Sequence, residues 1–203
     1  LPALQVVIPL IAAPLCLLAG RASLAWTIAF LASACATAAA AILAYQTLHH
    51  GPISYHMGGW APPWGIEYAV DSANAFILLL VSGIATVVLL YCPSSVSKEI
   101  RAGREHMFYC MFILCLTGLL GIAITGDAFN VFVFLEISSL SSYALIAMGS
   151  QRKALTASFQ YLIMGTIGAT FFLIGVGLLY MITGTLNLVD LQTRIPQIQD
   201  SRP

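Results

Sequence analysis

The chain has 203 residues, of which 60% are hydrophobic and only 8% are charged. Soluble domains carry about 25% charged residues, so a soluble fold of this length would have too little polar surface. The Lys/Arg and Asp/Glu side chains balance at eight each, and they leave no basic patch to neutralise nucleic-acid phosphates. Composition therefore predicts an integral membrane protein that meets the lipid bilayer, and it excludes nucleic acid as a partner.

Six apolar runs are long enough to cross a bilayer, because a transmembrane helix needs about 20 mostly apolar residues. The runs do not alternate strictly, which favours helices over the strands of a barrel. We place the spans at 3–20, 22–48, 72–92, 106–125, 129–149 and 154–182. Residues 1–182 then form one all-α transmembrane domain, followed by a short tail at 183–203. The first run has no basic leading segment and no small-residue cleavage site, so we expect a true span and not a signal peptide.

The loops between these runs differ in charge. The first, third and fifth loops hold Arg21, then Lys98, Arg101 and Arg104, then Arg152 and Lys153, whereas Arg194 and Arg202 lie in the tail. The second and fourth loops contain no Lys or Arg. An excess of these residues marks cytoplasmic loops. We therefore predict an external N-terminus. The expected location is a bacterial inner membrane.

The second loop, at 49–71, is long enough for structure of its own. Its Gly-Gly and Pro-Pro pairs are turn signals, and the short segments 54–57 and 65–70 can pair as a small external hairpin. The chain has no CxxC pair, no His at metal-ligand spacing to a cysteine, and no nucleotide-binding motif. We therefore expect its five cysteines to be small buried side chains, with no metal and no organic cofactor.

Glu136 is the candidate functional residue. It lies about seven residues inside the fifth span, or roughly 10 Å along a helix. An acid at that depth is costly, so it must be protonated, paired or next to water, and such acids are functional by default. Ser139 and Tyr143 share its helix face at i+3 and i+7, and together they form a candidate path for protons. The alternative is a structural hydrogen bond to a neighbouring helix.

Other polar residues of the spans have two interpretations each. Ser138, Ser141 and Ser142 can extend the polar path and can also let helices pack closely, and the two roles can hold together. Asp127, in the link before the fifth span, either caps that helix or takes part in proton access. Gln160, in the sixth span, can face Glu136 through water. The glycines of that span are expected to permit close helix approach, and they are Gly165, Gly168, Gly175 and Gly177.

Three segments carry a family resemblance: GGWAPPWGIEYAVD, TGDAFNVFVFLEISSLSSYALIA and LLYMITGTLNLVDL. They resemble the antiporter-like proton-conducting subunits of Mrp-type cation/proton antiporters, complex I and membrane-bound hydrogenases. The first and third segments look closest to the D subunit of the Mrp type. The resemblance runs in order over nearly the whole chain.

This resemblance implies the N-terminal part of an all-helical transporter with two inverted five-helix repeats and about fourteen spans. Glu136 matches the proton-handling Glu of the fifth helix, which the family pairs with a Lys on the seventh. No Lys or Arg lies in the interior of a span here. The resemblance therefore implies either a fragment or a subunit completed by a second polypeptide.

The function that the resemblance implies is proton translocation in a multisubunit Na⁺/H⁺ antiporter. Its partners would be other membrane subunits, protons and monovalent cations, and the chain would have no catalytic centre of its own. One alternative is a proton-pumping subunit in the membrane arm of a quinone-reducing or hydrogen-evolving oxidoreductase. A second alternative is a structural membrane subunit that moves no ion.

Overall fold

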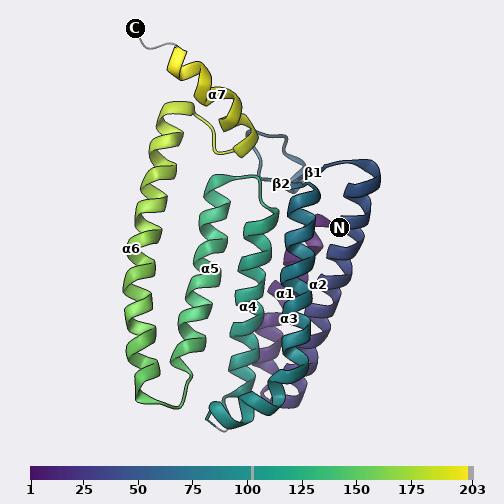
Figure 1. Ribbon diagram of the computed structural model, residues 1–203, viewed down its shortest axis with the longest axis vertical. Helices are drawn as coiled ribbons and strands as arrows, with labels where there is room; N and C mark the ends of the chain where they lie inside the picture. The colour runs from purple at the N-terminus through teal and green to yellow at the C-terminus, as the bar shows by residue number, and fades with distance from the viewer. Residues whose placement is uncertain (102, 201–203) are drawn as a thin grey trace.

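The computed structural model describes residues 1–101 and 103–200, and most of them are helical (Figure 1). Within these described residues, six helices are long and apolar enough to span a membrane: α1 Pro2–Ala19, α2 Ala22–His50, α3 Ser72–Glu99, α4 Glu105–Ile124, α5 Ala128–Ala147 and α6 Arg152–Thr183. The predicted all-α membrane fold is therefore confirmed. Most helix ends lie close to the predicted ends of the spans.

The largest difference is at α3, which continues through Pro93 to Glu99, whereas the prediction ended the span at residue 92. The prediction followed hydropathy, and the residues from Ser94 to Glu99 are polar apart from Val96. Their backbone still forms helical hydrogen bonds, and the Ser94 hydroxyl donates to the carbonyl of Tyr91 at 2.9 Å. Hydropathy marks the part of a helix that suits lipid, and a helix can extend beyond it.

Small side chains in α2 let the helices of the bundle approach closely. A buried stripe with a spacing of three or four residues faces the neighbouring helices, and its members are Ala25, Ala29, Ala32, Ala36 and Ala40. Polar contacts add to this packing, since the Trp26 indole donates to the Leu89 carbonyl of α3 at 2.8 Å. At the other edge of the bundle, α6 packs against α5 and is otherwise largely exposed (Figure 1).

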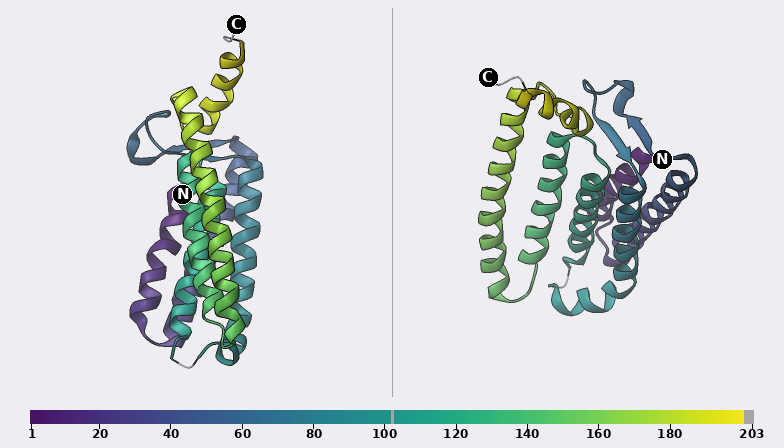
Figure 2. Two further views of the ribbon diagram at one scale, coloured as in Figure 1. Left: turned by 90° about the vertical axis from the view of Figure 1, so that its left-hand side faces the viewer. Right: turned by 45° about the horizontal axis from the view of Figure 1, so that its top comes forward.

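The two ends of the bundle carry different elements (Figure 2). One end, called here the hairpin end, carries strands β1 Ile53–His56 and β2 Glu67–Val70, joined through the short 3₁₀ turn η1 Met57–Gly59. The strands pair antiparallel, with Ile53 opposite Val70, so the predicted hairpin is confirmed. The α4–α5 link also lies at this end, and the loops after α1, α3 and α5 lie at the opposite end (Figure 1).

The predicted tail contains a further helix, α7 Leu188–Asp200, which lies across the hairpin end (Figure 1). Residues 201–203 are outside the described part of the chain. Leu191 is buried, and Arg194 forms an ion pair with Asp190 at 2.9 Å. Arg194 also donates to the carbonyl of Thr183 at 3.0 Å, so it ties α7 to the end of α6. No element was predicted here, because a tail of this length is too short to fold alone.

Candidate functional site

The start of α5 is fixed by Asp127. Its Oδ1 accepts a hydrogen bond from the backbone N–H of Asn130 at 2.7 Å, which is a helix N-cap. The carboxyl is buried, and this desolvation raises its pKa, while hydrogen bonds from the N–H groups of Asn130 and Phe129 act in the opposite direction. The capping interpretation is therefore confirmed, and a role for Asp127 in proton access stays a prediction.

Substitutions at Asp127 separate these two roles. Asp127→Ala removes the cap and is expected to destabilise the protein by about 1 kcal/mol, whereas Asp127→Asn keeps a good capping residue. If Asp127 only caps α5, the Asn variant will keep both thermal stability and proton flux. Loss of flux in the Asn variant, with stability unchanged, would instead assign the carboxyl to proton access. Melting temperature and flux are measured on the same preparations.

One face of α5 packs tightly on α4. A Cβ added to Gly118 would lie 2.6 Å from the Ser138 nitrogen, so the two backbones are in close contact. The hydroxyls of Ser138, Ser141 and Ser142 donate to carbonyls of their own helix, at 2.9, 2.6 and 2.8 Å. Ser142 also lies 3.4 Å from the sulfur of Cys115 in α4. Ser138 and Ser142 therefore contact α4, as the packing interpretation expects, and a part of these serines in a polar path stays a prediction.

The opposite face of α5 is turned toward α6. Phe132 stacks on Phe172 with ring centroids 6.4 Å apart. Tyr143 lies edge-on to Tyr161 at 4.9 Å, and its carbonyl accepts from the Ser158 hydroxyl at 2.7 Å. Phe132 and Tyr143 therefore mark two heights along α5 at which this face contacts α6. We call the face that carries both residues the α6-facing stripe of α5.

Glu136 lies on this stripe between the two heights. Positions 132, 136, 139 and 143 fall within about 60° of one another on a helix with 3.6 residues per turn. Glu136 and Ser139 are half-buried and Tyr143 is buried, so the structure brings the three predicted residues onto one face. Within the described residues, neither the Glu136 carboxyl nor the Ser139 hydroxyl has a hydrogen-bond partner or a salt bridge. The alternative of a structural bond to a neighbouring helix thus has no support inside this chain.

Gly165 shapes the same contact. The Tyr143 hydroxyl occupies the space that a Cβ at Gly165 would fill, so close approach is confirmed at this glycine. It is not confirmed at the other three, because nothing lies within 4 Å of an added Cβ at Gly168, Gly175 or Gly177. Each of these three positions faces open space in this chain.

The structure does not bring Gln160 to Glu136. Gln160 is exposed, and it points away from the face of α6 that holds Ser158, Gly165 and Phe172. It also lies closer to the start of α6 than Gly165, which is level with Tyr143. Glu136 lies seven residues, or about 10 Å, from Tyr143 along α5, on the side away from Gln160. A role for Gln160 in proton transfer stays a prediction and would need contacts from outside this chain.

A polar junction at the hairpin end was not predicted. Asn187 donates to the Glu67 carboxylate at 2.8 Å, and the Ser54 hydroxyl donates to the same carboxylate. The N–H of Gly126 donates to the Glu67 carbonyl at 2.8 Å, and Ala128 donates to Leu186 at 2.9 Å. The hairpin, the α4–α5 link and the segment before α7 are therefore joined at the mouth of the α5–α6 pair. All three segments belong to the motifs that carried the family resemblance. These motifs were the one sequence signal that could have pointed to the junction.

Asn187 holds this junction together and also caps α7, since its Oδ1 accepts from Val189 and Asp190 at 3.0 Å. Asn187→Ala removes both interactions. It is expected to lower the free energy of local unfolding of α7 by about 1–3 kcal/mol. Hydrogen exchange should then become faster in residues 188–197 and unchanged in α2. Unchanged protection of α7 would show that Arg194 and Leu191 alone hold the helix in place.

Residues 125–202 match the model of the family described as NADH:quinone oxidoreductase/Mrp antiporter, TM. The N subunit of the NADH-quinone oxidoreductase of Desulforudis audaxviator is 44% identical over 99% of this chain and 40% of its own length. The D subunit of the Na⁺/H⁺ antiporter of Bacillus subtilis is 35% identical over 82% of this chain and 33% of its own length.

Solved structures agree with the sequence matches. A chain of the membrane-bound sulfane sulfur reductase, an archaeal respiratory membrane complex, aligns with a TM-score of 0.90 and 34% identity, over 97% of this chain and 40% of that chain. This chain belongs to the antiporter-like membrane subunits. A chain of the Mrp complex from Dietzia sp. aligns with a TM-score of 0.82 and 28% identity, over 92% of this chain and 35% of that one.

The antiporter-like chain thus spans about 40% of the first relative and 33% of the second. Identity does not decide between the antiporter and the oxidoreductase branches, because relatives of both kinds align over most of the chain.

Proposed function

We propose that this antiporter-like chain forms the first part of a proton-translocating subunit in a multisubunit Na⁺/H⁺ antiporter. The observation that carries the proposal is Glu136, a half-buried intramembrane acid on the α6-facing stripe of α5. Such a group is costly in a membrane unless it works with a proton, a cation or water. The proposal is supported by the relatives that are named as the D subunit of a Na⁺/H⁺ antiporter.

The proposed mechanism is electrostatic. A cation brought close to Glu136 favours the carboxylate, and its withdrawal favours the protonated acid. Alternating between these two arrangements would release and then load a proton. Ser139 and Tyr143, one and two turns further along the stripe, would pass it on through hydroxyls and water. The spans of this chain contain no Lys or Arg in their interior, so the cation is proposed to come from another helix of the assembly.

The proposed setting is a bacterial inner membrane with the hairpin end outside. Six of the eight Lys/Arg residues lie in the loops after α1, α3 and α5 or in the helix turns next to them, and the structure places these loops at one end of the bundle. The largely exposed α6 is proposed to meet other helices of the complex. Protons would then enter or leave at the hairpin end, near the junction of Glu67 with Asn187 and near Asp127, which pairs with Asn187 through a backbone bridge.

A second candidate is the membrane arm of a redox-driven complex. It is favoured by the 44% identity to the N subunit of an NADH-quinone oxidoreductase and by the TM-score of 0.90 to a respiratory reductase. The two candidates predict the same chemistry at Glu136 and differ in what drives it.

Purified complex in sealed vesicles distinguishes the two. An antiporter moves protons when a Na⁺ gradient alone is imposed, with no electron donor present. A redox-driven pump moves protons only when NADH or another electron donor is oxidised. If neither driving force moved protons in complexes that assemble normally, the chain would be a structural subunit and the proposal would be contradicted.

A further inference from the structure

A basic cavity lies at the end of the bundle opposite the hairpin. It has a volume of about 240 Å³, and three arginines line it together with the chain that joins α5 to α6. Arg101 and Arg104 come from the loop before α4, and Arg152 begins α6. An antiparallel bridge between Ile100 and Gly149 holds the two loops together. The cavity is therefore built from two loops that are fixed to one another.

The charge of this cavity is not compensated by the acids nearby. Glu105 accepts from the N–H of Gly103 at 2.9 Å, and Glu99 accepts from the Ser95 hydroxyl at 3.4 Å. Neither acid lines the cavity, and within residues 1–101 and 103–200 none of its arginines forms a salt bridge. Three arginines thus line one space, and a guanidinium group offers a planar pair of donors that suits a phosphate.

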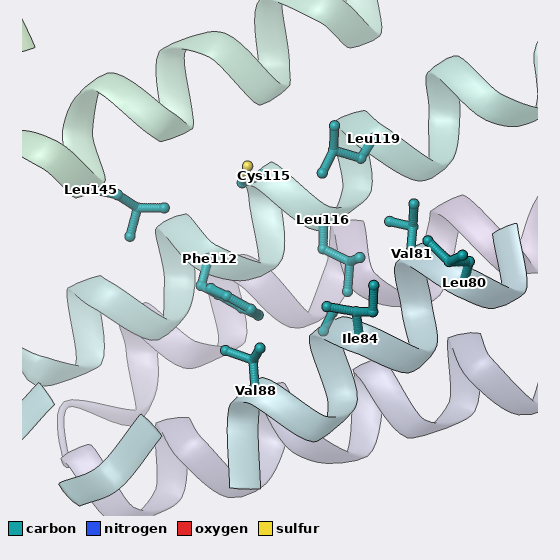
Figure 3. A pocket seen from close by; sticks show the side chains of 10 residues that line it. Leu80, Val81, Ile84, Val88, Phe112, Cys115, Leu116, Leu119 and Leu145 are labelled. Carbon is teal, nitrogen blue, oxygen red and sulfur yellow. The ribbon is translucent and has the colours of Figure 1, made fainter. Parts of the chain in front are cut away.

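An apolar groove shares the last turn of α5 with this cavity. It has a volume of about 350 Å³ and lies between α3, α4 and α5. Figure 3 shows its side chains, which are aliphatic or aromatic apart from Cys115. Leu145 of α5 lines the groove, and Ala147, two residues further on, lines the basic cavity. The last turn of α5 is therefore shared by the two spaces.

The groove begins inside one leaflet and runs past the centre of the bilayer. Phe112 lies seven residues into α4, or about 10 Å from its start, and Leu119 lies about 21 Å from it. A leaflet contributes about 15 Å of hydrocarbon, since the whole core is about 30 Å thick. A molecule with its charge at the arginines would place its acyl chain along Phe112 and Leu116, toward the bilayer centre.

We propose that the cavity and the groove bind one anionic phospholipid. Its phosphate lies among Arg101, Arg104 and Arg152, and an acyl chain fills the groove. Charge complementarity favours a phosphate over a neutral headgroup, and the apolar groove favours a lipid over a free anion. The lipid would stabilise the α3–α4 and α5–α6 loops against each other, far from Glu136.

The test uses the purified intact complex in neutral detergent, with dioleoyl phosphatidylglycerol as the probe and native mass spectrometry as the readout. The test variant carries Arg101→Gln, Arg104→Gln and Arg152→Gln. A matched control carries Arg21→Gln, Lys98→Gln and Lys153→Gln, which removes the same charge from the same end. We expect the test variant to bind the lipid at least about tenfold more weakly than the control.

Two further measurements define the ligand. Ile84→Trp narrows the groove without touching the arginines, and it should weaken lipid binding in the folded protein. Inorganic phosphate should bind far more weakly than the lipid. Equal losses in both triple variants would show diffuse charge attraction and would overturn the proposal. It would also be overturned by phosphate binding as tight as the lipid, or by a wild-type complex that takes up no lipid because a partner's acids occupy the arginines.

Discussion

Replacing Glu136 by Gln is expected to lower Na⁺-driven proton flux by at least roughly tenfold in vesicles that carry the intact complex, because a group that transfers protons typically contributes more than that. Gln has nearly the same shape as Glu and can still form hydrogen bonds, but it neither binds nor releases a proton at physiological pH. Helix packing around position 136 should be unchanged, since the residue lies on the α6-facing stripe and is only half-buried.

The matched control is Glu99→Gln, which neutralises an exposed acid at the end of α3. This control should keep wild-type flux and wild-type assembly. Flux is measured with a pH-sensitive dye after a Na⁺ gradient is applied, and the amount of complex per vesicle is quantified for every variant. Wild-type flux in the Glu136→Gln complex would assign the residue a structural role and would remove the chain from the proton path.

Replacing Gly118 by Ala is expected to cost about 1–3 kcal/mol of stability, as is typical of overpacked sites. An added Cβ would lie 2.6 Å from the Ser138 nitrogen and 2.7 Å from the Phe134 carbonyl oxygen. Both neighbours are backbone atoms of α5, which no rotamer change can move away. The α4 and α5 helices would have to separate, and the stripe that carries Glu136 would shift with α5.

Gly83→Ala is the control for this prediction. Nothing lies within 4 Å of an added Cβ at Gly83, which is in the interior of α3. There Ala should stabilise the helix by roughly 0.5–1 kcal/mol, because Gly loses more conformational freedom on folding. The two changes are therefore expected to move the melting temperature in opposite directions. A Gly118→Ala protein as stable as wild type would show that the contact between α4 and α5 is looser than described.

Most of the fold follows from apolar length alone, which gave all six spans and most of their ends. The face shared by Glu136, Ser139 and Tyr143 was also predicted, because helix periodicity holds whatever the neighbours are. Periodicity could not say which helix each face would meet. The serines at 138 and 142 contact α4, and all three serines at 138, 141 and 142 use their hydroxyls within α5.

The polar junction could not be predicted for a different reason. Glu67 and Asn187 are 120 residues apart, and neither has a local pattern that indicates its partner. Gln160 shows a different limit. An amide in an apolar span suggests a function, but the sequence does not show which way the side chain points. Tertiary packing decides both cases.

Infrared difference spectroscopy of the reconstituted complex tests the central claim most directly. The claim is that Glu136 itself gains and loses a proton during transport. Imposing and then removing the ion gradient should produce a carboxylic acid C=O band that appears and disappears in wild type, persists in Glu99→Gln and is absent in Glu136→Gln. The same band in the Glu136→Gln complex would show that another group carries the proton and would contradict the account.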